Sequence, residues 1–178
     1  ARRELSRSTE EVNNSLGRLS SGLRLNRAGD ASGTARAGRF RSRVRGSQLA
    51  QRNAQDGVSM MQTAEGSLGE TAGILQRMRE LAVEASNDSR DENERNALDG
   101  EVRQMLAQID DLANETQFNG ISVLSVAQTV TLQAGAHPEH SLEITLESAR
   151  SEDLGLNGIS VSSASGALSA ISTVDAAL

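Results

Sequence analysis

The chain has 178 residues, a formal net charge of −6 and almost no aromatic side chains, with two Phe and no Trp or Tyr. Large aromatic residues dominate compact cores and small-molecule pockets, so this composition disfavours a thick globule with a deep cleft. It favours a thin assembly of helices closed by small side chains. The absence of cysteine excludes disulfides, thiolate metal sites and cysteine nucleophiles. No apolar run reaches membrane-spanning length.

Arginine is concentrated at the start of the chain. Residues 1–52 contain 12 Arg and four acidic residues, whereas residues 53–178 contain six Arg and 20 acidic residues. An arginine-rich arm can bind nucleic acid, or it can pack beside an acidic neighbour in the same molecule or the next one. We favour the second interpretation, because the arm has no lysine for phosphate contacts and no series of interleaved aromatic residues for base stacking. We therefore expect no nucleic acid partner. Because no apolar run is long enough to span a membrane, we expect no membrane partner either.

The first segment predicts a helix with one narrow apolar seam. Val12, Leu16, Leu19 and Leu23 follow one another at steps of four, three and four. A seam of this kind needs a partner helix. Residues 24–31 are mostly small or polar and contain glycine, which predicts a connector.

A long helix is predicted from about Ala31 to Ala85, with two apolar stripes that indicate more than one neighbour. The first stripe comprises Ala54, Val58, Met61, Leu68, Ala72, Leu75 and Ala82, and the second Ile74, Met78, Leu81 and Ala85. Each glycine inside this helix costs roughly 1 kcal/mol relative to alanine, so the glycines need a compensating role. We expect Gly66, Gly69 and Gly73 to permit close approach of another helix.

A second helix is predicted after a short loop, with Ser89 and Glu92 as its capping box. Since the loop is short, the two helices should form an antiparallel hairpin. Asp110 and Asp111 are interpreted as charges on its exposed face. The apolar seam of this helix comprises Leu98, Val102, Met105, Ile109 and Leu112.

Alternation of apolar and polar residues predicts a β-hairpin near residues 128–147, with a loop of about six residues at 135–140. Helical spacing resumes at residues 168–178, where the sequence stops inside the predicted helix. We therefore expect a carboxy-terminal partner segment that this sequence lacks. The predicted fold class is mainly α, an elongated rod of long antiparallel helices in a coiled-coil-like bundle with a small β-hairpin.

Signals for catalysis are weak. His137 and His140 flank the proline of the predicted hairpin loop, where a solvated turn is favoured over a metal site. The sequence has no phosphate-binding loop, no dinucleotide fingerprint and no nucleophile elbow. We expect neither enzymatic activity nor a cofactor.

Four blocks of sequence resemble bacterial flagellins in order and type. They are RLSSGLRLN at 18–26, RNAQDGVSMMQTAEGSL at 52–68, QRMRELAV at 76–83 and ETQFNG at 115–120. A hook–filament junction protein shares the terminal heptads, but the last two blocks favour flagellin.

The resemblance implies a division of the chain into two layers. Residues 1–24 would be the amino-terminal helix of the coiled-coil layer that lines the filament core, with the four seam residues as its assembly surface. Residues 25–178 would form the helical rod domain, incomplete at the carboxy terminus. Within it, ISTVDAAL at 171–178 resembles the start of a returning helix. The segment 26–40 departs from the family pattern in having Asp30 as its single acid and Arg36 where an aliphatic residue is common.

The resemblance also implies a secreted subunit of the extracellular flagellum. Its partners would be other flagellin subunits, the flagellar export machinery and a chaperone. It further implies a patch recognised by Toll-like receptor five of a host, formed by Arg77 and Leu81, one turn apart, and by Glu101 of the following helix. The residues alone favour a core position for Leu81 and a solvated charge for Glu101, and the resemblance reverses that preference.

Overall fold

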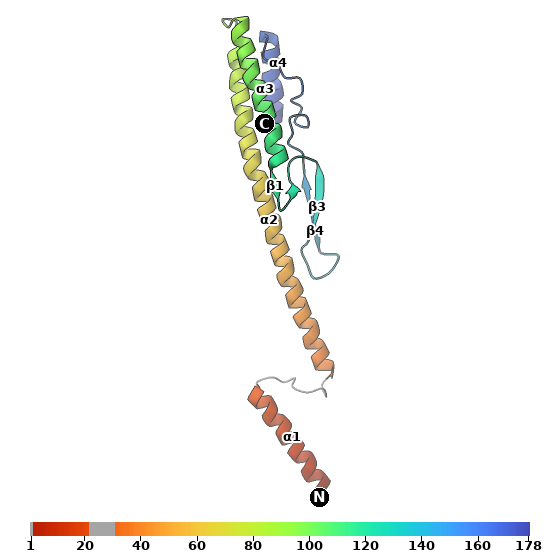
Figure 1. Ribbon diagram of the computed structural model, residues 1–178. Coiled ribbons are helices and arrows are strands. Elements are labelled where there is room, and N and C mark those ends of the chain that lie inside the picture. The colour runs from red at the N-terminus through yellow and green to blue at the C-terminus, as the bar shows by residue number, and fades with distance from the viewer. Residues whose placement is uncertain (1, 22–30) are drawn as a thin grey trace. The chain divides into compact units, whose positions relative to one another are not determined.

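The computed structural model describes residues 2–21 and 31–178 (Figure 1). The chain divides into two compact units, Ala1–Ala50 and Gln51–Leu178. Four α-helices are found among the described residues: α1 (Arg2–Ser21), α2 (Ala31–Ala85), α3 (Glu92–Glu115) and α4 (Ala164–Ala177). The mainly α fold class is therefore confirmed, as are the predicted bounds of the long helix. The predicted connector lies outside the described residues, apart from Ala31.

Two small antiparallel strand pairs complete the secondary structure of the described residues. Strands β1 (Gln117–Phe118) and β2 (Ile121–Ser122) are joined by Asn119 and Gly120, whose φ angles are +51° and +79°. An Asn-Gly pair tolerates these left-handed conformations better than most residues do. Strands β3 (Gln128–Gln133) and β4 (Ser141–Leu146) form the predicted hairpin, which is confirmed.

The main core of the second unit lies where α2, α3 and α4 run side by side (Figure 1). Its largest fully buried side chains, in a core without an aromatic residue, are Met78, Leu81, Val102, Ile109, Leu156, Val161 and Val174. Alanines of α2 and α4 fill the remaining space, which lets the helices approach closely. The composition thus predicted the character of this core correctly.

A second core cluster lies under the β3–β4 hairpin, where α2 meets the hairpin through a glycine. A Cβ atom on Gly57 would collide with Leu132 Cδ1 and lie 3.3 Å from Ile144 Cδ1. Beside it, Asn53 Nδ2 donates a hydrogen bond of 2.9 Å to the carbonyl oxygen of Gln133. Asn53 and Gly57 of the RNAQDG block thus provide the contact surface on α2 against which the β3–β4 hairpin packs.

The expected close approach at the other glycines of α2 is not seen. No atom would lie within 4 Å of a Cβ on Gly66, Gly69 or Gly73. These glycines face away from α3 and α4, so the glycine that makes a close contact is Gly57, and its neighbour is a hairpin instead of a helix.

The two predicted stripes of α2 have different environments. Met78, Leu81 and Ala85 of the second stripe are buried in the main core. In the first stripe Leu75 and Ala82 are buried, but the three large side chains nearer the amino terminus are exposed, namely Val58, Met61 and Leu68. The first stripe is therefore fully buried only at its carboxy-terminal end, and its large side chains from Val58 to Leu68 are exposed.

Candidate functional site: exposed surfaces of the helices

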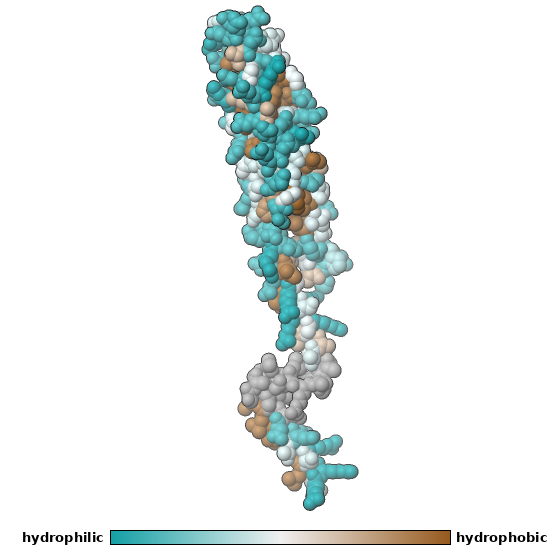
Figure 2. Space-filling view, in the orientation of Figure 1, coloured by the Kyte–Doolittle hydropathy of each residue, from teal (hydrophilic) through white to brown (hydrophobic). Residues whose placement is uncertain are grey.

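Helix α1 carries the predicted assembly seam on its surface. Val12 is 53% exposed, Leu16 58% and Leu19 85%, while Leu23 lies outside the described residues. Figure 2 shows brown apolar side chains at the surface of this helix. Exposed leucines repeated at heptad spacing are unfavourable in water unless another helix covers them. The described part of the seam is thus an apolar helix face that the other described residues leave exposed.

The three residues of the predicted receptor patch occupy two different environments. Arg77 has a side chain that is 54% exposed, and Glu101 is exposed on α3. Leu81, by contrast, is only 1% exposed and belongs to the main core. The structure therefore brings Arg77 and Glu101 together at the surface, but it places Leu81 beneath them, in the bundle interior.

Arg77 lies in an acidic environment. Its Nη1 atom donates to Glu80 Oε2 at 2.7 Å, and this hydrogen bond is the largest contribution that raises the pKa of the guanidinium. Partial desolvation acts in the opposite direction, while the negative charges of Glu80, Glu101 and Glu84 raise the pKa further. The cation is therefore held between acidic residues of α2 and α3.

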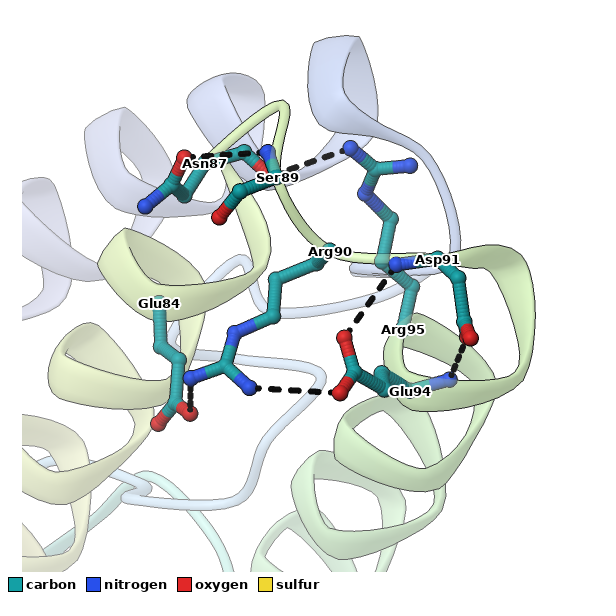
Figure 3. Close-up of polar contacts among 7 residues, drawn as sticks. All are labelled: Glu84, Asn87, Ser89, Arg90, Asp91, Glu94 and Arg95. Atoms are coloured by element: carbon teal, nitrogen blue, oxygen red, sulfur yellow. Dashed lines mark hydrogen bonds and ion pairs between the residues drawn. The ribbon is translucent and has the colours of Figure 1, made fainter.

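The turn between α2 and α3 differs in detail from its prediction (Figure 3). The N-cap of α3 is Asp91, whose side chain accepts a hydrogen bond of 2.7 Å from the Glu94 N–H. The Glu94 carboxylate in turn accepts from the Asp91 N–H at 3.2 Å. The predicted Ser89–Glu92 box is therefore wrong. Instead, the Ser89 N–H donates to the Asn87 side chain within the turn.

Two arginines, Arg90 and Arg95, form ion pairs and hydrogen bonds that connect this turn to α2 and α3. Arg90 pairs with Glu84 at 2.5 Å and with Glu94 at 3.5 Å. Arg95 donates from Nε to the Ala85 carbonyl oxygen, which is one of the terminal acceptors of α2. Figure 3 shows these side chains gathered around the end of α2.

Two aspartates of α3 have roles that the sequence did not indicate. Asp99 is 5% exposed and accepts hydrogen bonds from Ser160 Oγ at 2.7 Å and from the Val161 N–H at 2.9 Å. Asp110, which was interpreted as an exposed charge, accepts two hydrogen bonds from Ser151. Since they are 11 residues apart, the two aspartates lie on nearly the same side of α3, a spacing that could have revealed them.

Neither a metal site nor a membrane span occurs in the part of the chain that the structure describes. No three metal-ligating side chains converge there. His137 and His140 are adjacent, with their ring centroids 5.6 Å apart in an edge-to-face arrangement. No described helix is long and apolar enough to cross a membrane.

The long antiparallel helices α2 and α3, a main core without aromatic residues and the exposed heptad seam of α1 define a protein built from packed helices. A family model described as the bacterial flagellin N-terminal helical region matches residues 1–129. The chain therefore belongs to the bacterial flagellin family.

Relatives and solved structures agree with this assignment. A phase 2 flagellin from Salmonella typhimurium strain LT2 is 41% identical over 161 residues, which is 90% of this chain and 32% of that protein. A phase 1 flagellin from Salmonella naestved is 42% identical over 158 residues, which is 88% of this chain and 31% of that protein. The chain thus spans about a third of the length of these relatives. The crystal structure of Bacillus cereus flagellin matches with a TM-score of 0.61 and 29% identity, covering 71% of this chain and 74% of that one.

Proposed function

We propose that the chain is a structural, non-enzymatic subunit of the bacterial flagellar filament, which assembles with other copies through its helices. The observation that carries this proposal is the exposed seam of α1 in a chain that belongs to the flagellin family. An apolar heptad face is a surface for helix–helix packing, which is the chemistry that a helical polymer requires.

The two layers expected from the sequence are part of this proposal. Residues 1–24 would form the coiled-coil layer around the filament core, and residues 25–178 the rod domain. The exposed side chains of Val58, Met61 and Leu68 support an incomplete rod, because they leave one stripe of α2 uncovered. A returning carboxy-terminal helix would cover such a stripe.

Secretion also belongs to the proposal. The subunit would leave the cell through the flagellar export machinery, escorted by a chaperone, and would become part of the extracellular filament. No cofactor, nucleic acid or membrane partner is proposed. This scheme agrees with a bundle whose described surfaces include uncovered apolar faces, since such faces need protection before assembly.

Deletion of the encoding gene in the bacterium of origin tests the filament proposal. We expect the loss of filaments and of swimming, and the return of both when the intact gene is restored. In a second test, the variant with Leu16→Asp and Leu19→Asp should be expressed but absent from filaments, because the introduced charges would interrupt the apolar seam of α1. If the deletion strain, which cannot make this chain, still formed filaments of normal length, the proposal would be contradicted.

Recognition by Toll-like receptor five is a second proposal for the same rod. The observation that favours it is the exposed pair of Arg77 and Glu101, a cation and an anion on adjacent helices at the matching family positions. An exposed arginine is a frequent anchor of protein interfaces. Reporter cells that carry the receptor should respond to the chain, and Arg77→Ala should weaken the response. An equal response to the parent chain and to Arg77→Ala would show that Arg77 does not contribute to receptor recognition.

A further inference from the structure

A basic stripe runs along one side of α2. Its members are spaced by four, three and four residues, so they share one face of the helix. The stripe consists of Arg41, Arg45, Gln48 and Arg52, all exposed. Among the described residues, none of its three arginines has an ion pair or a hydrogen-bond partner. The sequence contains no acidic residue between Asp30 and Asp56 that could neutralise the stripe locally.

An acidic stripe with the same periodicity runs along α3. Its members are spaced by three, four, three and four residues, and they lie opposite the buried side chains of Val102 and Ile109. The stripe consists of Glu101, Gln104, Gln108, Asp111 and Glu115, all exposed. None of its three carboxylates forms a hydrogen bond or a close ion pair with another described residue. Arg77 of α2 lies near Glu101, whose negative charge helps to raise the pKa of the Arg77 guanidinium.

The two stripes match in length as well as in charge. At about 1.5 Å per helical residue, the basic stripe extends for about 16 Å and the acidic stripe for about 21 Å. The two compact units differ in the same way: the unit that contains most of the basic stripe is rich in arginine, and the unit that contains the acidic stripe is rich in acidic residues. Residues 1–50 have 11 Arg and four acidic residues, and residues 51–178 have seven Arg and 20 acidic residues. Each copy therefore presents a basic helix face and an acidic helix face that its own described residues leave unpaired.

We propose that the basic stripe of one copy docks along the acidic stripe of a second copy. The inference deepens the proposed filament function, since it names the partner as another copy and the contact as helix-to-helix charge pairing. Because the two stripes are different surfaces, the contact is heterologous: in a pair, one copy retains a free acidic stripe and the other a free basic stripe. A heterologous contact of this type can be repeated without limit, as a filament requires.

The stripes set orientation and register, while the apolar seam supplies most of the affinity. Exposed ion pairs are individually weak, and salt screens them over about 10 Å at 0.1 M ionic strength. Charge complementarity acts mainly by selecting the correct partner surface and by speeding encounter. The contact should therefore weaken as salt is added, without a change in the fold of either copy.

Two charge-reversed variants and their mixture provide the test. One carries Arg45→Glu with Arg52→Glu, and the other carries Glu101→Arg with Glu115→Arg. Sedimentation velocity at low salt should show that each variant alone needs about tenfold more protein to self-associate than the parent, because every contact joins like charges. An equal mixture should return towards the parental concentration, because each reversed stripe then meets its complement on the other variant.

A matched control separates pairing from net charge. Arg36 and Arg43 are also exposed and seven residues apart, on the side of α2 opposite to Arg45 and Arg52. The variant with Arg36→Glu and Arg43→Glu has the same charge change and should self-associate as the parent does. Circular dichroism would verify that all the variants remain helical.

Four results would decide against the inference or against its premise. Equal weakening in the control, or a mixture that fails to recover, would overturn the pairing while leaving the filament function intact. Binding of duplex DNA that only the Arg45 and Arg52 variant loses, without a change in self-association, would assign the basic stripe to nucleic acid. A parent that neither self-associates nor enters filaments would refute the filament function itself.

Discussion

The Asp99 carboxylate of α3 and the backbone N–H of Val161 lie 2.9 Å apart, and this hydrogen bond joins α3 to the segment that leads into α4. Ser160 Oγ donates to the same carboxylate oxygen, and Arg103 Nε contacts the other oxygen at 2.8 Å. One buried side chain thus anchors a segment that lies 62 residues further along the sequence.

Replacing Asp99 with alanine should destabilise the bundle markedly. The buried Val161 N–H would lose its acceptor, and an unsatisfied buried donor costs about 1–3 kcal/mol. Urea unfolding of Asp99→Ala should show this loss. Asp111→Ala is the matched control, because Asp111 is an exposed carboxylate on the same helix, and its stability should stay within about 0.5 kcal/mol of the parent. Equal losses in both variants would refute the anchoring role.

Stability should also depend on the charge of Asp99. Burial acts to raise the pKa of this carboxyl, but the hydrogen bonds from Ser160 and Val161 and the charge of Arg103 outweigh burial and hold the pKa below its ordinary value of 3.8. A depressed pKa in the folded state gives stability that is present above the unfolded-state pKa and is lost as the pH falls through the folded-state value. The free energy of unfolding should therefore fall as the pH drops below about 4, and this fall should be smaller in Asp99→Asn, as urea unfolding at a series of pH values would measure.

Alanine substitutions at Gly69 and Gly57 of α2 should have different effects on the stability of the chain. Gly69→Ala meets open space and removes a helix-destabilising residue, so the chain should gain about 1 kcal/mol. Gly57→Ala gives the same gain in helix propensity but drives a methyl group into Leu132, and overpacking costs about 1–3 kcal/mol. Thermal unfolding should place Gly57→Ala at least about 1 kcal/mol below Gly69→Ala. Equal stabilisation would mean that the hairpin does not rest on Gly57.

The cap of α3 can be tested directly at the turn. Asp91→Ala removes the acceptor for the Glu94 N–H and should cost about 1 kcal/mol. Ser89→Ala should cost much less, since the contact within the turn comes from the Ser89 backbone. Chemical denaturation of the two variants distinguishes the observed cap from the one expected at Ser89.

Arg77 and Leu81 should behave differently in stability measurements. Leu81→Ala empties a fully buried position and should cost about 2–5 kcal/mol, whereas Arg77→Ala changes an exposed side chain and should cost less than about 1 kcal/mol. A receptor assay of Leu81→Ala is meaningful only at a temperature where the variant is folded. Under that condition, normal signalling by Leu81→Ala would show that this leucine supports the helix without contacting the receptor.

The helices and the hairpin were predictable because their signals are local. Heptad spacing in α3 and strict alternation around Val130 and Ile144 depend on neighbours within a few residues, and both were correct. The bounds of α2 followed from the small and polar residues at each end. The capping box was misplaced because Ser89 and Asp91 are both acceptable caps, and the choice depends on where the turn bends.

Contacts between distant segments could not be predicted from the same signals. Nothing in the neighbourhood of Asp99 shows that Ser160 will reach it, and nothing near Gly57 shows that Leu132 will cover it. Leu81 illustrates the same difficulty for the candidate site, because apolar spacing favours a core residue, whereas the family resemblance favours half of a surface pair. Its burial comes from the assembled core to which α2, α3 and α4 all contribute, and no local pattern shows that assembly.

Between Thr34 and Leu49, the described side chains of α2 are exposed except for partly covered Ala37 and Gly46. Isolated helices without a packed face are marginal in water. Under the proposed filament function, this stretch would gain packing partners only when a copy joins others. Addition of a copy to an existing end would then be favoured over the meeting of two free copies, which would give polymer growth a nucleation barrier.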